Sequence, residues 1–347
     1  PGANQLLSPL SLSMAFSMAW MGARGETAAE MASALQYGAL SDEAILAQNR
    51  LAFESLYRNL PDLQVLLANS IWCLDDYPFE DAFLDQAVED FYASVRAVRR
   101  AEGADPAALI NQWASDNTAG KIPGILEDLD PNIVMVLLNA LYFKGDWVNP
   151  FPSDATAPAP FTCPDGRIVQ AATMNLRETF LLKEAKEYLA VSLPYEGGLS
   201  MVLALSGSGL GADDKLLGFL PMILGPEAWS AADLQVALPK FDFAVTMDLP
   251  DRMRSLGMEK AFLSGVADFS GMSPRAMADG MYIAKAIQKT AITVTEKGTE
   301  AAAVTAIGMG TTSMPRSIRF DRSFLFAIVD GQGVPLFVGL VADPTAG

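Results

Sequence analysis

Side chains able to perform catalysis are scarce in this chain of 347 residues. There is no histidine, so the usual general base for a serine or cysteine nucleophile and the commonest zinc ligand are both missing. Its two cysteines, Cys73 and Cys163, lie in unrelated segments and form no CxxC pair, so they are expected to be ordinary thiols, and a disulfide between them has no support. The glycines between 207 and 211 are closely followed by two aspartates, which would repel a phosphate. The sequence therefore predicts no enzyme, no bound metal and no cofactor.

The segment from 298 to 317 has a pattern that fits a change of structure rather than catalysis. It offers small residues and threonines but few large apolar side chains, so it is expected to form an exposed loop. In its first part every second residue is small, and in a β-strand these residues would share one face while their neighbours share the other. The small set is Thr299, Ala301, Ala303 and Thr305, and the intervening set is Glu300, Ala302 and Val304. The segment could therefore join a sheet without clashing with the core, although Glu-Ala-Ala-Ala also has high helix propensity.

The composition places limits on partners. The net charge of −17 and the isoelectric point near 4.4 argue against binding to nucleic acid and to heparin-like polyanions, because both reward basic patches. The longest apolar run, 133–143, is shorter than the roughly 18 residues that a membrane span needs. No linker or internal repeat divides the chain, and half of its residues are apolar, which is ample for a core.

Local signals predict helices in the first part of the chain and mostly strands later. Ser8 and Pro9 form a strong start for a helix that ends at Gly22, and Thr27 with Glu30 forms a capping-box pattern for a second helix that stops at 38. Further helices are expected at 41–57, 78–92, 106–118, 212–220 and 249–256, and strands at 63–74, 93–98, 134–143, 282–294, 323–329 and 334–341, with hairpins between 161 and 243. Because strands and helices do not alternate regularly, this order predicts an α+β fold.

Besides the segment that begins at Glu296, several other blocks along the chain carry distinctive motifs. They comprise residues 111–122, 138–147, 238–241, 256–258 with 267–272, and 335–341. Together with Glu296-x-Gly-Thr-Glu-Ala-Ala-Ala-x-Thr, these blocks resemble, in content and in order, those of the serpins, the suicide inhibitors of serine and cysteine proteases. Each block is modest alone, but the combination is highly specific and covers nearly the whole chain.

The resemblance implies a single serpin-like domain over residues 1–347, with helices packed on a large, mostly antiparallel sheet plus smaller sheets. It also implies a reactive-centre loop at about 296–319, whose upstream half inserts into the large sheet after cleavage and so traps the protease as an acyl-enzyme. The first helix of the family is largely absent from residues 1–347. A secretion signal would lie upstream, so the compartment stays open, with an extracellular one favoured.

By motif, the resemblance assigns three groups of residues to the insertion cycle. A hinge is expected to bend at Gly298 and then to join the sheet, while Glu296 at its start pairs with Lys240 beside Trp147. A buried polar network is expected beneath the central strands, with Gln288 in place of the family's usual histidine. The hinge comprises Glu296, Gly298, Thr299, Glu300, Ala301, Ala302, Ala303, Val304 and Thr305, and the network comprises Ser8, Ser11, Asn139 and Gln288. Plain helix capping by the serines and a plain core position for Trp147 are the alternatives.

The length of the loop places the bait bond. Glu296 to Thr312 spans seventeen residues, the usual serpin distance from the hinge glutamate to the cleaved bond, so the bond is predicted between Thr312 and Ser313. The flanking residues that would set specificity are Met309, Gly310, Thr311 and Met314. A small β-branched Thr312 favours elastase-like or subtilisin-like serine proteases, with a cysteine protease as a further option, whereas a trypsin-like enzyme would need Arg316. The expected inhibitor is a monomer. The alternative is a non-inhibitory carrier or chaperone, which the hinge disfavours because none of its inward-facing residues is charged or bulky.

Overall fold

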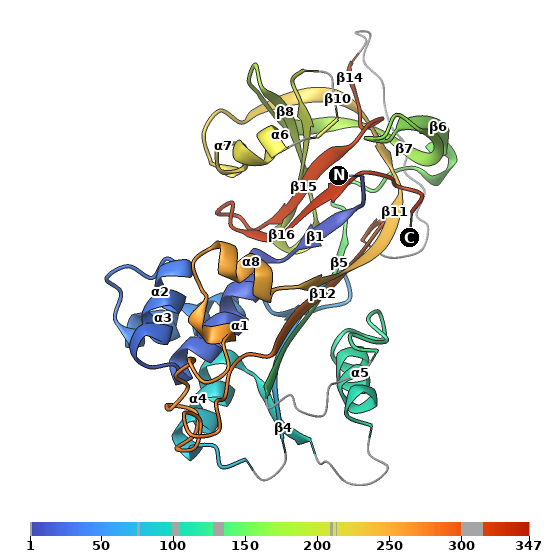
Figure 1. The fold of residues 1–347 in the computed structure, drawn as a ribbon. Helices are drawn as coiled ribbons and strands as arrows, with labels where there is room; N and C mark the ends of the chain where they lie inside the picture. The colour runs from blue at the N-terminus through green and yellow to red at the C-terminus, as the bar shows by residue number, and fades with distance from the viewer. Residues whose placement is uncertain are drawn as a thin grey trace.

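The structure is a computed structural model of the chain. It describes residues 2–74, 77–98, 105–127, 135–208, 211–212, 214–299 and 315–346. Two β-sheets form the framework, and helices cover both faces of one of them (Figure 1).

One sheet, called here the main sheet, has seven strands within the described ranges. In spatial order these are β11 (Phe241–Asp248), β12 (Lys285–Val294), β5 (Met135–Asp146), β3 (Leu63–Leu74) and β2 (Arg58–Asn59), with β13 (Gly298–Thr299) beside β5 and β4 (Ser94–Val98) beside β3. Strands β12 and β5 run parallel, whereas β11 is antiparallel to β12 and β3 is antiparallel to β5. A strand antiparallel to both β12 and β5 could therefore fit between them, and we call their shared boundary the seam.

The second sheet has nine strands in the described part of the chain. In spatial order they are β1 (Gln5–Leu7), β16 (Pro335–Val341), β15 (Phe324–Val329), β9 (Ser200–Ser206), β8 (Tyr188–Pro194), β7 (Ile168–Glu184), β10 (Ser230–Pro239) and β14 (Arg316–Arg319), with β6 (Ala157–Thr162) beside β7. These strands pair antiparallel except for β10 and β14, which are parallel. The sheet thus ends in β14, the strand directly downstream of the predicted bait bond.

Helices pack on the two faces of the main sheet and on the second sheet. They are α1 (Pro9–Gly22), α2 (Gly25–Ala34), α3 (Asp42–Leu56), α4 (Asp81–Phe91), α5 (Pro106–Asn117), α6 (Asp214–Gly218), α7 (Leu220–Leu224) and α8 (Pro250–Ser255). Figure 1 shows α1 to α4 on one side of the main sheet and α5 on the other. Among the residues described, no helix combines the length and apolar character needed to cross a lipid bilayer.

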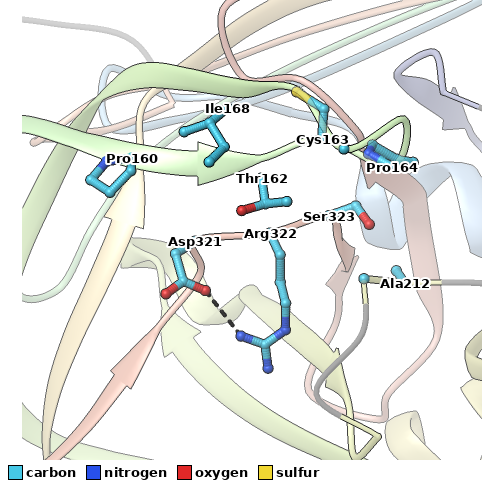
Figure 2. Close-up of a pocket in the computed structure, with 11 residues that line it drawn as sticks. Pro160, Thr162, Cys163, Pro164, Ile168, Ala212, Asp321, Arg322 and Ser323 are labelled. Atoms are coloured by element: carbon cyan, nitrogen blue, oxygen red, sulfur yellow. Dashed lines mark hydrogen bonds and ion pairs between the residues drawn. The ribbon is translucent and has the colours of Figure 1, made fainter.

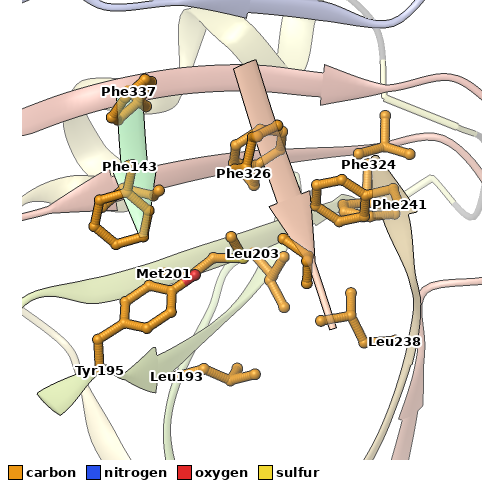
Figure 3. Packing of buried hydrophobic residues seen from close by; sticks show 14 of the residues in the cluster. Phe143, Leu193, Tyr195, Met201, Leu203, Leu238, Phe241, Phe324, Phe326 and Phe337 are labelled. Atoms are coloured by element: carbon orange, nitrogen blue, oxygen red, sulfur yellow. The ribbon is translucent and has the colours of Figure 1, made fainter. Parts of the chain in front are cut away.

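Strand β5 is buried on both faces, which explains its nearly unbroken apolar sequence. Val136 and Leu138 pack with α5, while Leu137 packs with α1 and α4 on the opposite face. Further along the strand, Phe143 joins the core that lies between the two sheets. Its ring lies between those of Phe337 and Tyr195, at centroid distances of 6.0 and 5.0 Å (Figure 3). Strand β5 therefore links three separate packing regions.

The structure corrects several predicted helix boundaries. Helix α2 begins at Gly25 rather than at Thr27, because the hydroxyl of Thr27 accepts a tertiary hydrogen bond from the N–H of Asp268 at 3.0 Å instead of capping the helix. It ends at Ala34, before 38. Helix α4 begins at Asp81 rather than at 78, and the helix predicted at 212–220 is two short helices, α6 and α7.

The prediction of an exposed loop over 298–317 is wrong at both ends. Gly298–Thr299 forms β13 in the main sheet, and the side chain of Thr299 is fully buried. At the other end, Arg316 already belongs to β14. Both ends are ordered by pairing with strands far away in the sequence, which local propensity cannot reveal.

Candidate functional site

A polar network joins the two strands of the seam. Gln288 of β12 and Asn139 of β5 are register partners. The side-chain amide of Gln288 donates to Asn139 Oδ1 and to the carbonyl of Ser8, both at 3.0 Å, and its oxygen accepts the N–H of Ser8 at 2.9 Å. Asn139 in turn donates to Ser11 Oγ and, at 2.7 Å, to Asn69 Oδ1. One side-chain hydrogen bond, between Gln288 and Asn139, thus crosses the seam. The bonds to Ser8 and Ser11 connect the two seam strands to the start of α1.

The structure brings together the four residues predicted for this network and adds Asn69. Ser8 has two roles, because its hydroxyl also caps α1 by accepting the N–H of Ser11 at 3.2 Å. Asn69 of β3 is the register partner of Asn139. The sequence analysis missed Asn69 because no periodic pattern distinguishes it from its neighbours in the strand. All members are buried amides or hydroxyls, which do not change charge with pH. Since an orphaned buried polar group costs about 1–3 kcal/mol, the network resists separation of the strands.

A turn at Glu296 and Lys297 follows β12. The two predicted hinge residues directly after this turn lie in the main sheet. Strand β13 pairs antiparallel with the end of β5, with Gly298 opposite Asp146 and Thr299 opposite Gly145. Gly298 has a φ of +152°, and a Cβ at this position would lie 2.0 Å from the carbonyl oxygen of Gly145. A Cβ at Gly145 would lie 2.8 Å from the ring of Phe143. Glycine is therefore required at position 298 for β13 to approach β5 this closely, whereas Gly145 leaves room for the aromatic rings of the core.

Thr299 points into the core, where it contacts a tyrosine. Its Oγ1 lies 3.1 Å from the hydroxyl of Tyr195, whose ring stacks on Trp147 with centroids 4.1 Å apart. Trp147 is itself buried and donates from Nε1 to the carbonyl of Thr295 at 3.1 Å, so the indole is both a core aromatic and a contact of the turn. Tyr195 escaped the sequence analysis because it is 104 residues from Thr299.

Glu296 lies where the hinge turn leaves β12. Its carboxylate lies 2.9 Å from Lys240 Nζ and accepts the hydroxyl of Thr156 at 3.0 Å. Burial by itself would raise the pKa of Glu296, but the hydrogen bonds from Lys240 and Thr156 outweigh it, so the pKa lies below its ordinary value of 4.5. The backbone carbonyl of Glu296 accepts the N–H of Phe151 at 2.7 Å. Thr156 was missed because a lone threonine in a loop carries no pattern.

The remaining predicted hinge residues and the bait bond lie outside the described residues. They are Glu300, Ala301, Ala302, Ala303, Val304 and Thr305 of the hinge, and Met309, Gly310, Thr311, Thr312, Ser313 and Met314 around the bond.

Arg316, the residue that a trypsin-like protease would need, is held in β14. Its backbone is the parallel register partner of Leu234 in β10. Its guanidinium donates to both carboxylate oxygens of Glu184 in β7, at 2.5 and 2.6 Å, and these bonds lower the pKa of Glu184. Arg316 is therefore fixed through both its main chain and its side chain.

A groove of about 730 Å³ lies apart from the seam, between β6 and the connection from β14 to β15. Figure 2 shows its ion pair between Asp321 and Arg322, at 2.9 Å, across from Cys163. Cys163 is a buried free thiol, and burial together with Asp343 raises its pKa; the side chain of Cys73 lies outside the described part. None of the groove's lining residues belongs to the seam, and within the described ranges no cluster of side chains could hold a metal ion.

Replacement of Gln288 tests the network. In Gln288→Ala the N–H of Ser8 and the side chain of Asn139 lose their partners, so the intact protein should lose about 2–4 kcal/mol of stability, measured as a shift of the urea unfolding midpoint. Gln170→Ala, on an exposed position of β7, is the matched control and should change stability by less than about 0.5 kcal/mol. Equal midpoints for the two variants would contradict the role of the network.

The lowered pKa of Glu296 predicts a pH dependence with a defined sign. Because the folded-state pKa lies below 4.5, the ion pair with Lys240 stabilises the protein above that pH and loses its effect as pH falls through the folded value. Glu296→Gln should therefore destabilise by at most about 1 kcal/mol at neutral pH and by less in acid. Thermal melting of both proteins across this range measures it. A difference that stays constant with pH would rule the pair out as its source.

Comparison with known proteins places these features in a family. A family model described as Serpin (serine protease inhibitor) matches residues 1–344. A Serine protease inhibitor of Cyanea capillata is 32% identical over 100% of this chain and 94% of its own length, and mouse Alpha-1-antitrypsin 1-4 is 30% identical over 99% and 84%.

Solved structures agree with the predicted α+β fold. Serpin48 of the insect Tenebrio molitor has a TM-score of 0.88 at 30% identity, covering 99% of this chain and 92% of that chain. Human thyroxine-binding globulin, in complex with thyroxine, has a TM-score of 0.87 at 26% identity, covering 100% and 93%. Because the family model spans all but the last three residues and the fold matches that of solved serpins, the chain belongs to the serpin family, whose members in general inhibit proteases rather than catalyse reactions.

Proposed function

We propose that this protein, as one serpin-like domain, is an irreversible suicide-substrate inhibitor of serine proteases. A protease cleaves the reactive loop, and the freed hinge inserts into the seam before the acyl-enzyme is hydrolysed, which carries the protease away and distorts its active site. The observation that carries this proposal is β13, because Gly298 and Thr299 already pair with β5 as the first residues of such a strand. No enzymatic activity of its own is proposed.

The register of β13 supports insertion of the residues that follow it. Continuing the antiparallel pairing past Thr299 would set Ala301 opposite Phe143 and Ala303 opposite Leu141, and both partners on β5 are buried. A large or charged side chain facing this packed core would cost several kcal/mol, whereas alanine adds almost no volume. The small residues therefore fall at the positions where the core needs them.

The same register would bring Thr305 to the polar network. On one side it would lie opposite Asn139, and the hairpin bridge between Thr295 and Gly298, continued along β12, places Gln288 on its other side. A strand that separates Gln288 from Asn139 breaks their mutual hydrogen bond, and a threonine hydroxyl can donate and accept in its place. Insertion would thus replace the bond that it removes.

The parallel direction of β12 and β5 would make insertion of a strand between them energetically favourable. Insertion would exchange the single parallel pair of the main sheet's centre for two antiparallel pairs, which have more favourable hydrogen-bond geometry and add backbone bonds. The intact protein would accordingly be kinetically trapped rather than at its lowest free energy.

A non-inhibitory carrier or chaperone remains the alternative class. Thyroxine-binding globulin, a structural neighbour, is seen in complex with thyroxine. The hinge of the present chain argues for inhibition, because its inward-facing positions are Thr299, Ala301, Ala303 and Thr305 and contain no obstacle to insertion.

We further propose that cleavage falls between Thr312 and Ser313 and that the target is elastase-like or subtilisin-like. The position of Arg316 supports this assignment, because a residue held in β14 by Leu234 and Glu184 is poorly presented to a trypsin-like protease. The proposed inhibitor acts as a monomer, without nucleic acid, membrane or heparin as a partner.

Incubation with elastase or subtilisin should give an adduct that survives denaturing gel electrophoresis. Thr299→Arg should be cleaved without forming the adduct, because position 299 is fully buried in β13 and an arginine there would have to bury an unpaired charge, at a cost of several kcal/mol, before the strand could form and extend. Glu300→Arg, at the next position and on the opposite strand face, is the control and should still form it. Turnover of the parent protein to cleaved product alone would remove the inhibitory proposal.

The bait bond can be read from the fragment released in the same reaction. N-terminal sequencing of the small C-terminal fragment should begin at Ser313, and Arg316→Ala should leave the rate of adduct formation unchanged. A fragment that begins at Ser317, with trypsin forming the adduct faster than elastase, would show that both the register and the target class are wrong.

A further inference from the structure

We propose that Tyr195 is a positioning residue for insertion, holding Gly298 and Thr299 in the main sheet as a preformed nucleus of the inserting strand. The inference rests on the proposed function and adds to it a residue outside the hinge and outside the polar network. Its basis is the contact between the hydroxyls of Tyr195 and Thr299 and the rigidity of the surroundings that hold the tyrosine.

The hydroxyl contact is sealed from water. Tyr195 is 1% exposed and Thr299 is 0% exposed, and their oxygens are 3.1 Å apart. A buried hydroxyl that loses its partner is penalised, because water cannot replace it. Burial also raises the pKa of Tyr195 far above its ordinary value, so the phenol keeps its proton at every pH at which the protein would act.

The ring of Tyr195 is held by contacts with other residues of the core, so it would stay in place if the hinge moved. It is stacked on Trp147 at an interplanar angle of 10° and meets the edge of Phe143 at 68°. Gly145 leaves the space that the ring occupies, since a Cβ there would lie 3.0 Å from Tyr195 Cδ1. The backbone N–H of Tyr195 donates to Leu199 at 2.9 Å. These contacts fix the position of the Tyr195 hydroxyl, and Thr299 is positioned by its contact with that hydroxyl.

Trp147 holds the turn before β13 from the same side. Its backbone N–H donates to the carbonyl of Lys297 at 2.6 Å, and its indole N–H donates to that of Thr295. The stacked pair of Trp147 and Tyr195 therefore contacts the chain at three successive points, and the contact with Thr299 is the last of them.

A preformed nucleus matters because trapping is a race between insertion and hydrolysis of the acyl-enzyme. A strand joins a sheet most slowly at its first residues, because ordering them fixes several backbone dihedrals while forming few hydrogen bonds. Each later residue adds a backbone pair at a lower entropic cost. If β13 must form anew after cleavage, a larger share of the acyl-enzyme is hydrolysed first. Loss of the nucleus should therefore raise the number of inhibitor molecules consumed per protease while leaving acylation itself unaffected.

Three variants test the hydroxyl contact. Tyr195→Phe and Thr299→Val each strand one buried hydroxyl, and each should raise the stoichiometry of inhibition about threefold or more. The double variant removes both hydroxyls at nearly constant shape and should return to within about twofold of the parent. In all three, the second-order rate constant of bait cleavage should stay unchanged. Tyr188→Phe, in a separate buried cluster, is the control.

Hydrogen exchange of the peptide that contains Gly298 and Thr299 reports on the nucleus directly. Exchange should be faster in each single variant than in the parent, the double variant and Tyr188→Phe. A parent-like stoichiometry in Tyr195→Phe, or a double variant as impaired as the singles, would overturn the inference even though the adduct forms. Absence of any adduct from the parent would instead overturn the proposed function, and the exchange rates would then decide on the nucleus alone.

Discussion

The parallel pairing of β12 with β5 is the constraint around which the rest of the molecule is arranged. Its neighbours in the main sheet pair antiparallel, and both of its strands carry helices or the interior core on their faces, so the seam lies in the middle of the structure rather than at an edge. Because β12 and β5 are parallel while their outer neighbours are antiparallel to them, one further strand between β12 and β5 would make every pair in the centre of the sheet antiparallel. In the intact chain the backbone pairing of β12 with β5 closes the seam, and the polar network adds a single side-chain bond across it.

The two ends of the seam differ in their chemistry. At the end where the hinge begins, Glu296 and Lys240 carry opposite charges, so the contact weakens in acid. Further along, Gln288 and Asn139 offer only amides, which keep their charge state at any pH. Acid should therefore loosen the turn without loosening the network, so that only one of these two contacts responds to pH.

Residues with a local signature could be predicted, and those defined by distant contacts could not. The start of α1 follows from Ser8 and Pro9, and the buried strand β5 follows from an unbroken apolar run. The same reasoning failed for Thr27, whose hydroxyl is used in a tertiary hydrogen bond with Asp268 rather than as a cap. Tyr195 lies in the bend between β8 and β9, and only the folded chain brings it to Thr299.

The two paired ends of the loop also fix a tether length. Thr299 in β13 and Arg316 in β14 leave the sixteen residues 300–315 to connect them. Going from Thr299 to the level of Asn139 and back takes at least about twelve residues, at roughly 3.3–3.6 Å for each. An uncut chain that reached the network would keep only about four of these sixteen residues to span from the level of Thr299 to β14, where the pairing with β10 holds Arg316. In the proposed mechanism, a cut downstream of Thr305 would abolish the return path, and the same residues could then enter the seam without pulling on β14.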